Sequence, residues 1–360
     1  MSEAPLSQLA VYTARPTVMI DAQSYPRVSE LVIGMEMTEQ ESGMSALELR
    51  VSNVSSDPGG GADLAFEDGA ILKLGAAISI HAGDENAPQE VFQGTITGLE
   101  IEFPGEGPPE LVVLAEDLFQ QARMARRTKL YENITLGDVA RELAGNLGLT
   151  PVITGLTDNI GTQVQLNESD LAFLRRLLTR YDGDLQIVGR ELHVSPLADV
   201  RRGEVELAMH SQLQEARVLA DLAHQVTEVT VTGWDPLRGE RVTAQSSGTQ
   251  RGPGTGRTGA AVLRDTVGER SHHLGHPVVV TDSEARALAD AAFDSRARRF
   301  LCLEGTAEGN PSIRVGTHVR VTGLGPRFDN TYYVTRTTHT YDAMHGYRTI
   351  FEAICAYWGG

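Results

Sequence analysis

Residues 164–178 read VQLNESDLAFLRRLL, and this stretch decides how the middle of the chain is interpreted. Asn167 is a residue type that caps helices, and apolar residues follow it at helical spacing. Gly183 is a residue type that ends them. We predict a helix that begins near Asn167 and ends before Gly183. Its apolar stripe consists of Leu171, Leu174, Leu178 and Tyr181, and its arginines, Arg175, Arg176 and Arg180, are expected to point elsewhere.

Two more helices are predicted from capping pairs. Thr135 with Asp138 at the third helical position predicts a helix start, and Gly148 predicts its end. The stripe between them is Leu136, Val139, Leu143 and Leu147. Thr281 with Glu284 repeats the pattern before a stripe of Ala285, Leu288, Ala289, Ala292 and Phe293. Between these helices, residues 185–188 and 191–194, joined by Gly189-Arg190, predict a hairpin.

Strand patterns occupy both ends of the chain. Short β-branched or alternating runs, separated by turn residues, predict a barrel or sandwich and not a βαβ sheet. The expected strands of the first part are 17–21, 30–37, 47–51, 77–81, 92–103 and 111–114, with turns at 57–61, 83–84 and 104–109. Those of the last part include 226–233, 317–322, 332–341 and 347–355.

The composition excludes several classes of function. The 360 residues include 48 acidic and 31 basic side chains, giving a formal net charge of −17. Such a chain repels phosphates and anionic lipids, so we expect no nucleic-acid binding and no stable membrane anchoring. No apolar run approaches the roughly 20 residues that span a bilayer, and the N-terminus lacks the pattern of a signal peptide. Two cysteines cannot form a disulfide framework, and we expect synthesis in the cytoplasm.

The chemical motifs are weak. Residues 254–259, GTGRTG, match the dinucleotide-binding string, but neither an apolar strand nor a helical stripe flanks them. We interpret residues 246–259 as a polar, flexible loop without a core of its own. His272, His273 and His276 lack a rigid helix and a standard zinc spacing, which favours a solvated loop over a metal site. The cluster 123–127, RMARR, is expected on a solvated face or against an acidic neighbour.

A thiol nucleophile is also considered. Cys302 or Cys355 with His339 could form a thiol–base pair, but both cysteines lie in apolar strand-like runs where buried, inert cysteines are common. We see no serine-hydrolase elbow and no P-loop lysine. We therefore expect no catalytic residues, no metal site, no cofactor and no enzymatic activity.

Two phrases resemble a known family. Residues 164–178 resemble the "Q-x-N-E-S/T-D-x-x-F-x-x-R-L" signature of the phage late control D family and of type VI secretion VgrG spike proteins. Residues 328–339, FDNTYYVTRTTH, with GYRT at 346–349, are similar to the "F-D/N-G-x-Y-x-V-x-x-x-x-H … G-Y-x-T" end of the hub barrel in that family. Residues 92–97, FQGTIT, and the helix at 135–147 support the resemblance. Asn330 stands where the family has Gly, and we expect Asp329-Asn330 to form a turn tolerant of positive φ.

The resemblance implies a baseplate hub of a contractile tail or injection machine, similar to the T4 tail hub and to the N-terminal hub of VgrG proteins. Such a hub is a homotrimer with two tube-like barrels per subunit, which adapts a hexameric inner tube to a trimeric spike. Because the sequence ends at residues 357–360, directly after the last expected strand, we expect the spike to be a separate protein. The implied partners are the spike, the inner tube protein and other baseplate components, within a phage-tail-like particle.

We therefore expect an α+β fold, mainly β. The expected domains are a first tube-like barrel at 1–117, a helix-containing α/β domain at 118–206, a second barrel at 207–235 and 301–360, and an insertion at 236–300. Two alternatives remain open. One is a tail-associated peptidoglycan hydrolase, which requires a pair of carboxyl groups in a cleft. The other is a binding module displayed on a particle.

Overall fold

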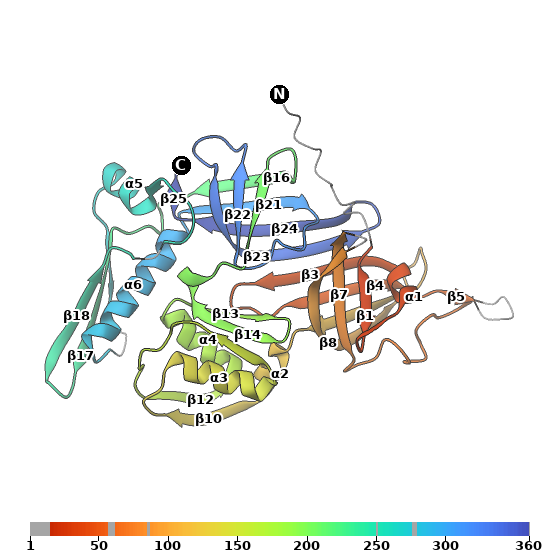
Figure 1. The fold of residues 1–360 in the computed structure, drawn as a ribbon, viewed down its shortest axis with the longest axis horizontal. Coiled ribbons are helices and arrows are strands. Elements are labelled where there is room, and N and C mark those ends of the chain that lie inside the picture. Colours follow the sequence, from red (N-terminus) through yellow and green to blue (C-terminus); the bar gives the residue numbers. More distant parts are fainter. Residues whose placement is uncertain (1–14, 57–61, 85–86, 250, 276–278, 360) are drawn as a thin grey trace.

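A computed structural model describes residues 15–56, 62–84, 87–249, 251–275 and 279–359. The fold is mainly β, as expected. One large sheet runs across the molecule, the α/β domain lies beside it, and the insertion lies at one end (Figure 1). The expected turn at 57–61 and the histidine at position 276 fall outside the described residues. The sheet has thirteen strands, and its main path is β16-β21-β24-β23-β3-β4-β9-β8-β7-β1-β2.

The first half of the sheet holds one hydrophobic core. Alternating strand residues fill this core, among them Val18, Met37, Leu49, Ile80 and Val113, each fully buried. The six expected strands are all present. The elements are β1 (Thr17–Ile20), β2 (Gln23–Ser24), α1 (Pro26–Glu30), β3 (Val32–Gln40), β4 (Ala46–Ser52), β5 (Ser55–Ser56), β6 (Ala62–Asp63), β7 (Ala77–Asp84), β8 (Ala87–Glu102) and β9 (Glu110–Glu116).

The second half encloses a separate core around Phe300, Tyr332 and Phe351. Its strands are β15 (Gly203–Ala208), β16 (Leu213–Ala220), β21 (Leu301–Glu308), β22 (Thr317–Thr322), β23 (Asn330–Asp342) and β24 (Gly346–Cys355). β15 pairs in parallel with β22, and the other ladders of this half are antiparallel.

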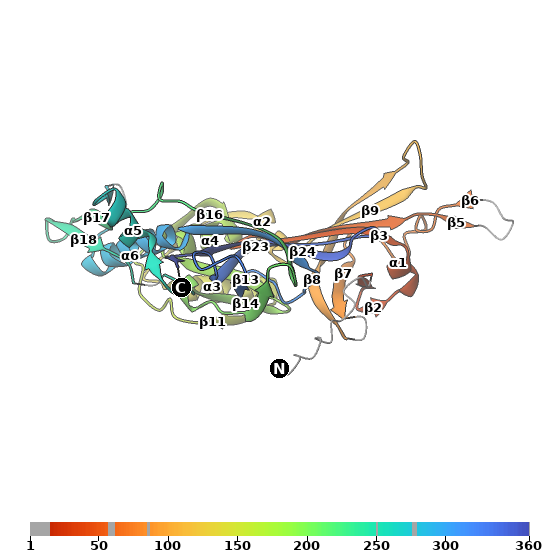
Figure 2. The same cartoon turned by 90° about the horizontal axis from the view of Figure 1, so that it is seen from above.

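The two halves are one hydrogen-bonded sheet. β3 pairs with β23 from Gln40↔Arg336 to Gly34↔Asp342. β23 and β24 are long enough to contribute side chains to both cores. Most of their buried residues pack in the second core, whereas Tyr341 and Tyr347, at the ends of these strands, pack in the first. Seen from above, these strands run along the length of the molecule (Figure 2). In the described chain the ladders do not close into barrels, although a bridge between Met209 and Leu213 joins the ends of β15 and β16.

The predicted helix that begins after Thr135 is confirmed in the α/β domain. The Thr135 hydroxyl accepts the backbone N–H of Asp138, the Asp138 carboxylate accepts that of Thr135, and Gly148 ends the helix at φ 66°. The predicted hairpin is also present, as β13 paired with β14. The elements are α2 (Phe119–Met124), β10 (Arg126–Tyr131), α3 (Leu136–Leu147), β11 (Thr150–Ile153), β12 (Gln163–Ser169), α4 (Asp170–Arg180), β13 (Gly183–Val188), β14 (Glu191–Pro196) and the 3₁₀ turn η1 (Leu197–Asp199).

The start of the helix in residues 164–178 was predicted wrongly. Ser169, not Asn167, is the cap, and its hydroxyl accepts the N–H of Ala172 at 3.3 Å. Asn167 lies in β12 with φ 49°, a left-handed conformation that Asn tolerates. The buried stripe is correct for Leu171, Leu174 and Leu178, while Tyr181 at the helix end is only half-buried.

The insertion has its own small sheet. β17 (Glu228–Asp235) pairs with β18 (Glu240–Ser246) and with β20 (Ser271–Leu274), and α6 (Asp282–Arg298) packs on them. Thr281 caps α6 as predicted. We expected residues 207–235 in the second barrel, but β17 pairs within the insertion, because its Val231 packs with Val242 and α6.

The segment 246–259 is not a loose loop. The Thr249 N–H and hydroxyl donate to the Asp294 carboxylate at 3.0–3.3 Å, although residue 250 lies outside the described chain. β19 (Arg257–Thr258) pairs with β25 (Tyr357–Trp358), and α5 (Gly259–Thr266) follows directly. We missed α5 because its apolar face, centred on Val262 and Leu263, is only two turns long.

Asn330 connects this segment to the second half of the sheet. Its side-chain oxygen accepts the Thr255 N–H at 3.0 Å, and its amide donates to the carbonyls of Thr255 and Tyr357 at 2.9 and 3.2 Å. The predicted positive φ at Asp329-Asn330 was wrong. The left-handed residues before β23 are Gly323 and Gly325. Asn330 is instead the first residue of β23, where it pairs with Val321 and contacts Thr255 through its side chain.

Candidate functional site

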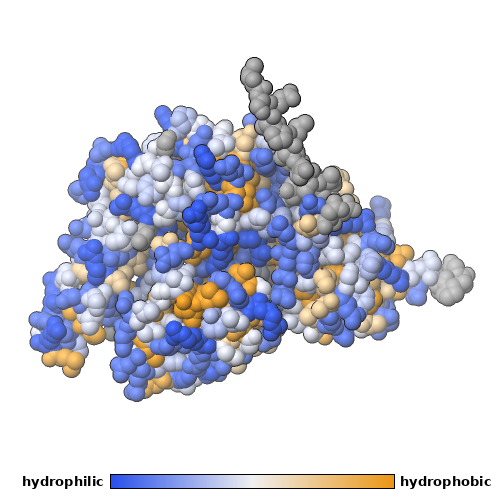
Figure 3. Space-filling view, viewed as in Figure 1, coloured by the Kyte–Doolittle hydropathy of each residue, from blue (hydrophilic) through white to orange (hydrophobic). Residues whose placement is uncertain are grey.

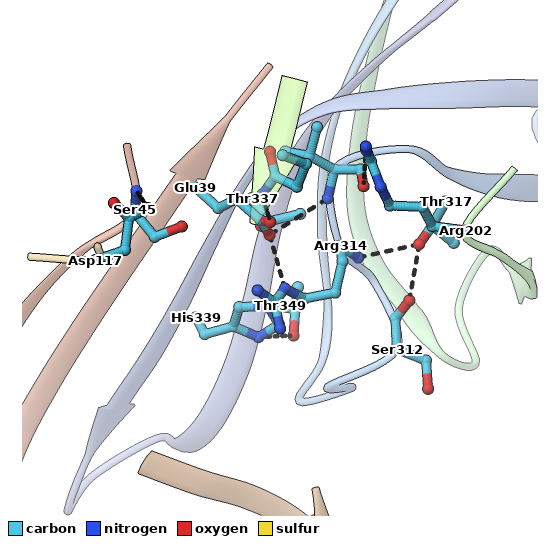
Figure 4. Close-up of polar contacts among 12 residues, drawn as sticks. Glu39, Ser45, Asp117, Arg202, Ser312, Arg314, Thr317, Thr337, His339 and Thr349 are labelled. Atoms are coloured by element: carbon cyan, nitrogen blue, oxygen red, sulfur yellow. Dashed lines mark hydrogen bonds and ion pairs between the residues drawn. The ribbon is translucent and has the colours of Figure 1, made fainter. Parts of the chain in front are cut away.

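A cavity of about 420 Å³ lies where the two halves of the sheet meet the α/β domain. Its lining comes from β3, β8, the end of β9, the β13–β14 turn and the loop between β21 and β22. Figure 4 shows the polar side chains that converge beside it. The charged groups of this lining include Glu39, Glu90, Asp117, Arg202 and Arg314.

Glu39 is the centre of the cluster. Its side chain is 3% exposed, and its carboxylate accepts the Arg314 Nε–H at 2.7 Å and the Val315 N–H at 3.4 Å. The Gln186 amide of β13 donates to the other oxygen. Burial opposes ionisation, but the Arg314 guanidinium outweighs it and holds the pKa of Glu39 below its usual value. One carboxylate therefore joins β3, the β21–β22 loop and the α/β domain.

The local sequence around Arg314 explains its position. The Thr317 hydroxyl accepts the Arg314 N–H at 3.2 Å and donates to the Ser312 carbonyl at 3.0 Å (Figure 4). Gly316, at φ 86°, makes the tight return into β22. The loop thus directs the guanidinium back toward β3, across 275 residues of sequence.

His339, Tyr347 and Thr349 form the second part of the cluster. The His339 Nδ1 lies 2.7 Å from the Tyr347 hydroxyl and 3.3 Å from the Thr349 hydroxyl. The two rings stack at 5.8 Å. Burial, and next the charge of Arg314, lowers the pKa of His339 to about 3, so the ring is neutral at pH 7. These residues are the histidine, the tyrosine and the threonine of the phrase found in residues 328–339 and 346–349. The tyrosine and the threonine provide hydrogen-bond partners for the buried histidine.

Asp117 lies at the other side of the cavity. Its carboxylate accepts the N–H groups of Ser45 at 2.6 Å and Phe119 at 2.9 Å, which fixes the exit from β9 into α2. Burial raises the pKa of Asp117 to about 6, and the two backbone donors only partly offset it.

Glu39 and Asp117 are two carboxyl groups in one cavity with displaced pKa values, as the hydrolase alternative requires. Their hydrogen bonds indicate a different role. Glu39 is held by an arginine, an amide and a backbone N–H, and Asp117 by two backbone N–H groups. Groups held in this way connect strands and loops. The Thr337 hydroxyl also donates to the Glu39 carboxylate at 3.5 Å. We therefore interpret the cluster as a structural junction, here called the three-way junction and defined by Glu39, Gln186, Arg314, Thr337, His339, Tyr347 and Thr349.

The other candidate residues do not converge. His339 pairs with Thr349 in the register of β23 and β24, whereas Cys355 lies at the far end of β24 against Leu301. Burial raises the pKa of the Cys355 thiol to about 12. Cys302, expected to be buried, points to the outer face of β21 and is exposed. Alternate residues of one strand face opposite sides of the sheet, and a short apolar run does not show which of them face the core. The sequence therefore did not reveal that Cys302 is exposed.

Within the described residues, the histidine and arginine motifs of the sequence lie in regular elements of the fold. His272 and His273 are neighbours on β20, and the described residues contain no group of three His, Cys, Asp or Glu side chains placed to hold a metal ion. Arg123 and Arg127 pair with Glu116 and Asp170, acidic neighbours of the same chain. Among the described residues, no helix is long and apolar enough to cross a membrane.

Glu39, Arg314 and Asp117, which line the cavity, were not identified from the sequence. Glu39 and Arg314 are single charged residues in strand and loop sequence, and Asp117 follows a strand as many surface residues do. One usable signal existed for Glu39. It takes an inward position in the alternation Met35, Met37, Glu39, where a charge requires a partner.

Comparisons with known proteins agree on the fold. The model of the family described as the Alg8 N-terminal domain matches residues 17–342. No curated protein matches the sequence. The 43 kDa tail protein of prophage MuSo2 from Shewanella oneidensis has a similar structure, with a TM-score of 0.69 and 13% identity over 95% of this chain and 98% of that one.

Two further structures are similar. The tail protein of Neisseria meningitidis MC58 gives a TM-score of 0.63 at 11% identity, over 94% of this chain and 96% of that one. The E. coli c3393 protein gives 0.55 at 14% identity, over 91% and 75%. That protein is described as a component of the type VI secretion system with structural similarity to the T4 phage tail proteins gp27 and gp5.

Proposed function

The chain belongs to the Alg8 N-terminal domain family, and we propose that it is a structural baseplate hub of a contractile tail or injection system. In this proposal three copies form a ring that adapts a hexameric inner tube to a trimeric spike. The observation that carries it is the likeness of fold to a prophage tail protein over nearly the whole of both chains. We propose the inner tube protein, a separate spike and other baseplate components as partners, within a phage-tail-like particle.

The construction of the sheet supports a role in transmitting force. A thrust along the particle must pass from one half of each subunit to the other without a hinge. Here β3 and β23 continue one hydrogen-bonded sheet between two cores, and the Glu39–Arg314 pair braces the point where they meet. In this proposal each half of the sheet would supply one of the two tube-like barrels, and the separate core of each half supports this assignment.

In this proposal three copies with two halves each place six units around an axis, which is how the hub would match six-fold and three-fold symmetry. The negative net charge suits a passage through which acidic cargo must not adhere. Neither argument needs a catalytic group, and the carboxylates of Glu39 and Asp117 already have structural partners.

The test is the mass of the purified full-length chain by sedimentation velocity, alone and with the spike and tube proteins encoded beside it. We expect a trimer, or a monomer that becomes trimeric when the spike is added. A chain that stays monomeric in both conditions overturns the proposal. Peptidoglycan zymography tests the alternative, with Glu39→Gln and Asp117→Asn as paired variants. Lysis by the wild type that both variants abolish, while circular dichroism shows that both remain folded, would establish a hydrolase.

A further inference from the structure

An arm projects from the first half of the sheet. β8 and β9 extend beyond the core as a two-stranded hairpin, which stands clear of the body in Figure 2. β7 pairs with β8 only as far as Thr95, so the outer edge of β8 beyond Ile96 has no strand partner within the described chain. We call residues 98–110 the arm.

The arm is amphipathic and acidic. Ile101 and Phe103 continue the inward apolar row of β8 past the end of the core, and they are 39% and 67% exposed. The arm contains Glu100, Glu102, Glu106 and Glu110 and no basic residue. Glu102 and Glu110 pair with Arg50 of β4, whereas Glu100 and Glu106 have no ion-pair partner in the described residues.

The α/β domain carries a surface of the complementary kind. β10 and β12 form a two-stranded sheet in which Leu130 lies opposite Val164. Together with Leu166 they make an exposed apolar row, 55%, 46% and 68% exposed. At one end of this row stands Arg126, an exposed arginine with no acidic partner in the described residues. We call these four residues the β10–β12 face.

The arm and this face belong to different parts of the fold. β10 and β12 lie at the outer end of the α/β domain, away from the first half of the sheet (Figure 1). A surface that meets a different surface of an identical copy forms a head-to-tail contact, and such contacts give a closed ring when the rotation between copies closes, as the proposed three-fold hub requires. Exposed apolar residues rimmed by charge are typical of such contacts.

We infer that the arm of one copy docks on the β10–β12 face of the next copy, with Ile101 and Phe103 on the apolar row and the free arm glutamates beside Arg126. The charges of the two surfaces indicate which partner the β10–β12 face binds. Exposed apolar residues also occur elsewhere on the surface (Figure 3). Arg126 favours an acidic partner, and in the arm the exposed apolar residues stand beside glutamates that have no ion-pair partner in the described residues. This inference deepens the proposed function and rests on it, because it names the contact that closes the proposed ring.

The experiment measures the mass of purified full-length variants by sedimentation velocity. Phe103→Ala and Leu166→Ala should each weaken self-association about tenfold or more, as expected for an apolar anchor. Leu237→Ala is the matched control, since Leu237 is 96% exposed on the turn between β17 and β18 and lies outside both surfaces. Circular dichroism melting shows that each variant is folded.

Charge reversal tests the pairing itself. Arg126→Glu and Glu106→Arg should each weaken the assembly, and the double variant should restore most of it. If the wild type is trimeric and none of these variants changes its mass, the docking inference is overturned and the hub proposal stands. If the wild type is monomeric even with its spike, both fall together. Weakening by the single variants without restoration in the double variant also rejects the arm as the occupant.

Discussion

The Nδ1 of His339 lies 2.7 Å from the hydroxyl of Tyr347, eight residues further along the chain, and both side chains are buried. The contact crosses the hairpin of β23 and β24 at the boundary between the two cores. The histidine is neutral at pH 7, and the tyrosine hydroxyl is the closest hydrogen-bond partner of its Nδ1. The residues that define the end of the sequence phrase are thus partners in the fold.

Tyr347→Phe should lower the free energy of unfolding by about 1–3 kcal/mol, because the buried imidazole loses its closest hydrogen-bond partner. Urea unfolding followed by circular dichroism measures it. Tyr25→Phe is the control, since the Tyr25 hydroxyl bonds Gln23 in an exposed position at 3.1 Å. That change should stay within about 0.5 kcal/mol. Equal effects of the two substitutions would contradict the assigned contact.

The stability should fall in mild acid through His339. Its pKa is lowered to about 3 in the folded chain, first by burial and then by Arg314, whereas the unfolded chain takes up a proton near the usual histidine value. Below that value the unfolded state binds more protons, so stability falls by about 1 kcal/mol per pH unit toward pH 4. His339→Asn should remove this part of the slope. A variant with the unchanged wild-type slope would refute the assignment.

Glu39→Gln should destabilise the fold by about 3 kcal/mol, because it removes the buried counter-charge of the half-buried Arg314 guanidinium. The matched control is Glu304→Gln, which breaks an exposed pair with Arg217 whose side chains are 62% and 73% exposed. The control should cost less than about 1 kcal/mol. Differential scanning calorimetry of both variants decides the matter, and similar melting temperatures would mean that the junction does not brace the sheet.

Gly254→Ala should destabilise the chain more than Gly268→Ala. Both glycines have left-handed backbones, with φ 103° and 113°, so the backbone strain is matched. A Cβ at Gly254 would come within 2.7 Å of the Asn330 side-chain oxygen and 2.8 Å of the Cys355 sulfur, whereas nothing lies within 4 Å at Gly268. The excess should be about 1–3 kcal/mol in urea unfolding. A zero difference would restore the original interpretation of residues 246–259 as a loose loop.

Leu174→Ala should cost about 2–5 kcal/mol, because this side chain is fully buried in the core of the α/β domain. Arg176, two residues further along α4, is exposed and pairs with Glu168 at 2.9 Å. Arg176→Ala should therefore change the stability by less than about 1 kcal/mol. Thermal melts of the two variants make the comparison, and a neutral Leu174→Ala would show that α4 is placed incorrectly.

The sequence by itself determined the elements whose signals are local. The capping pair of Thr135 and Asp138 spans four residues, and the alternation in β3 spans nine. These patterns act within one turn or one strand, so no distant contact is needed to interpret them. The same locality explains the error at Asn167. Two capping residue types stand two positions apart, and pairing of β12 with β10 extends the strand to Ser169, which moves the helix start.

Only the tertiary structure decided which charged and polar residues face inward together. Glu39 and Arg314 are 275 residues apart, and Asn330 and Thr255 are 75 apart. Nothing in the local sequence of Arg314, Asn330 or Thr255 distinguishes them from solvated residues. The inward position of Glu39 in β3 indicates a buried charge but not its partner, because that partner arrives from another element. The packing of the two halves brings those partners to one place. The junction and the anchoring of the insertion therefore emerge from the assembled sheet and not from any single segment.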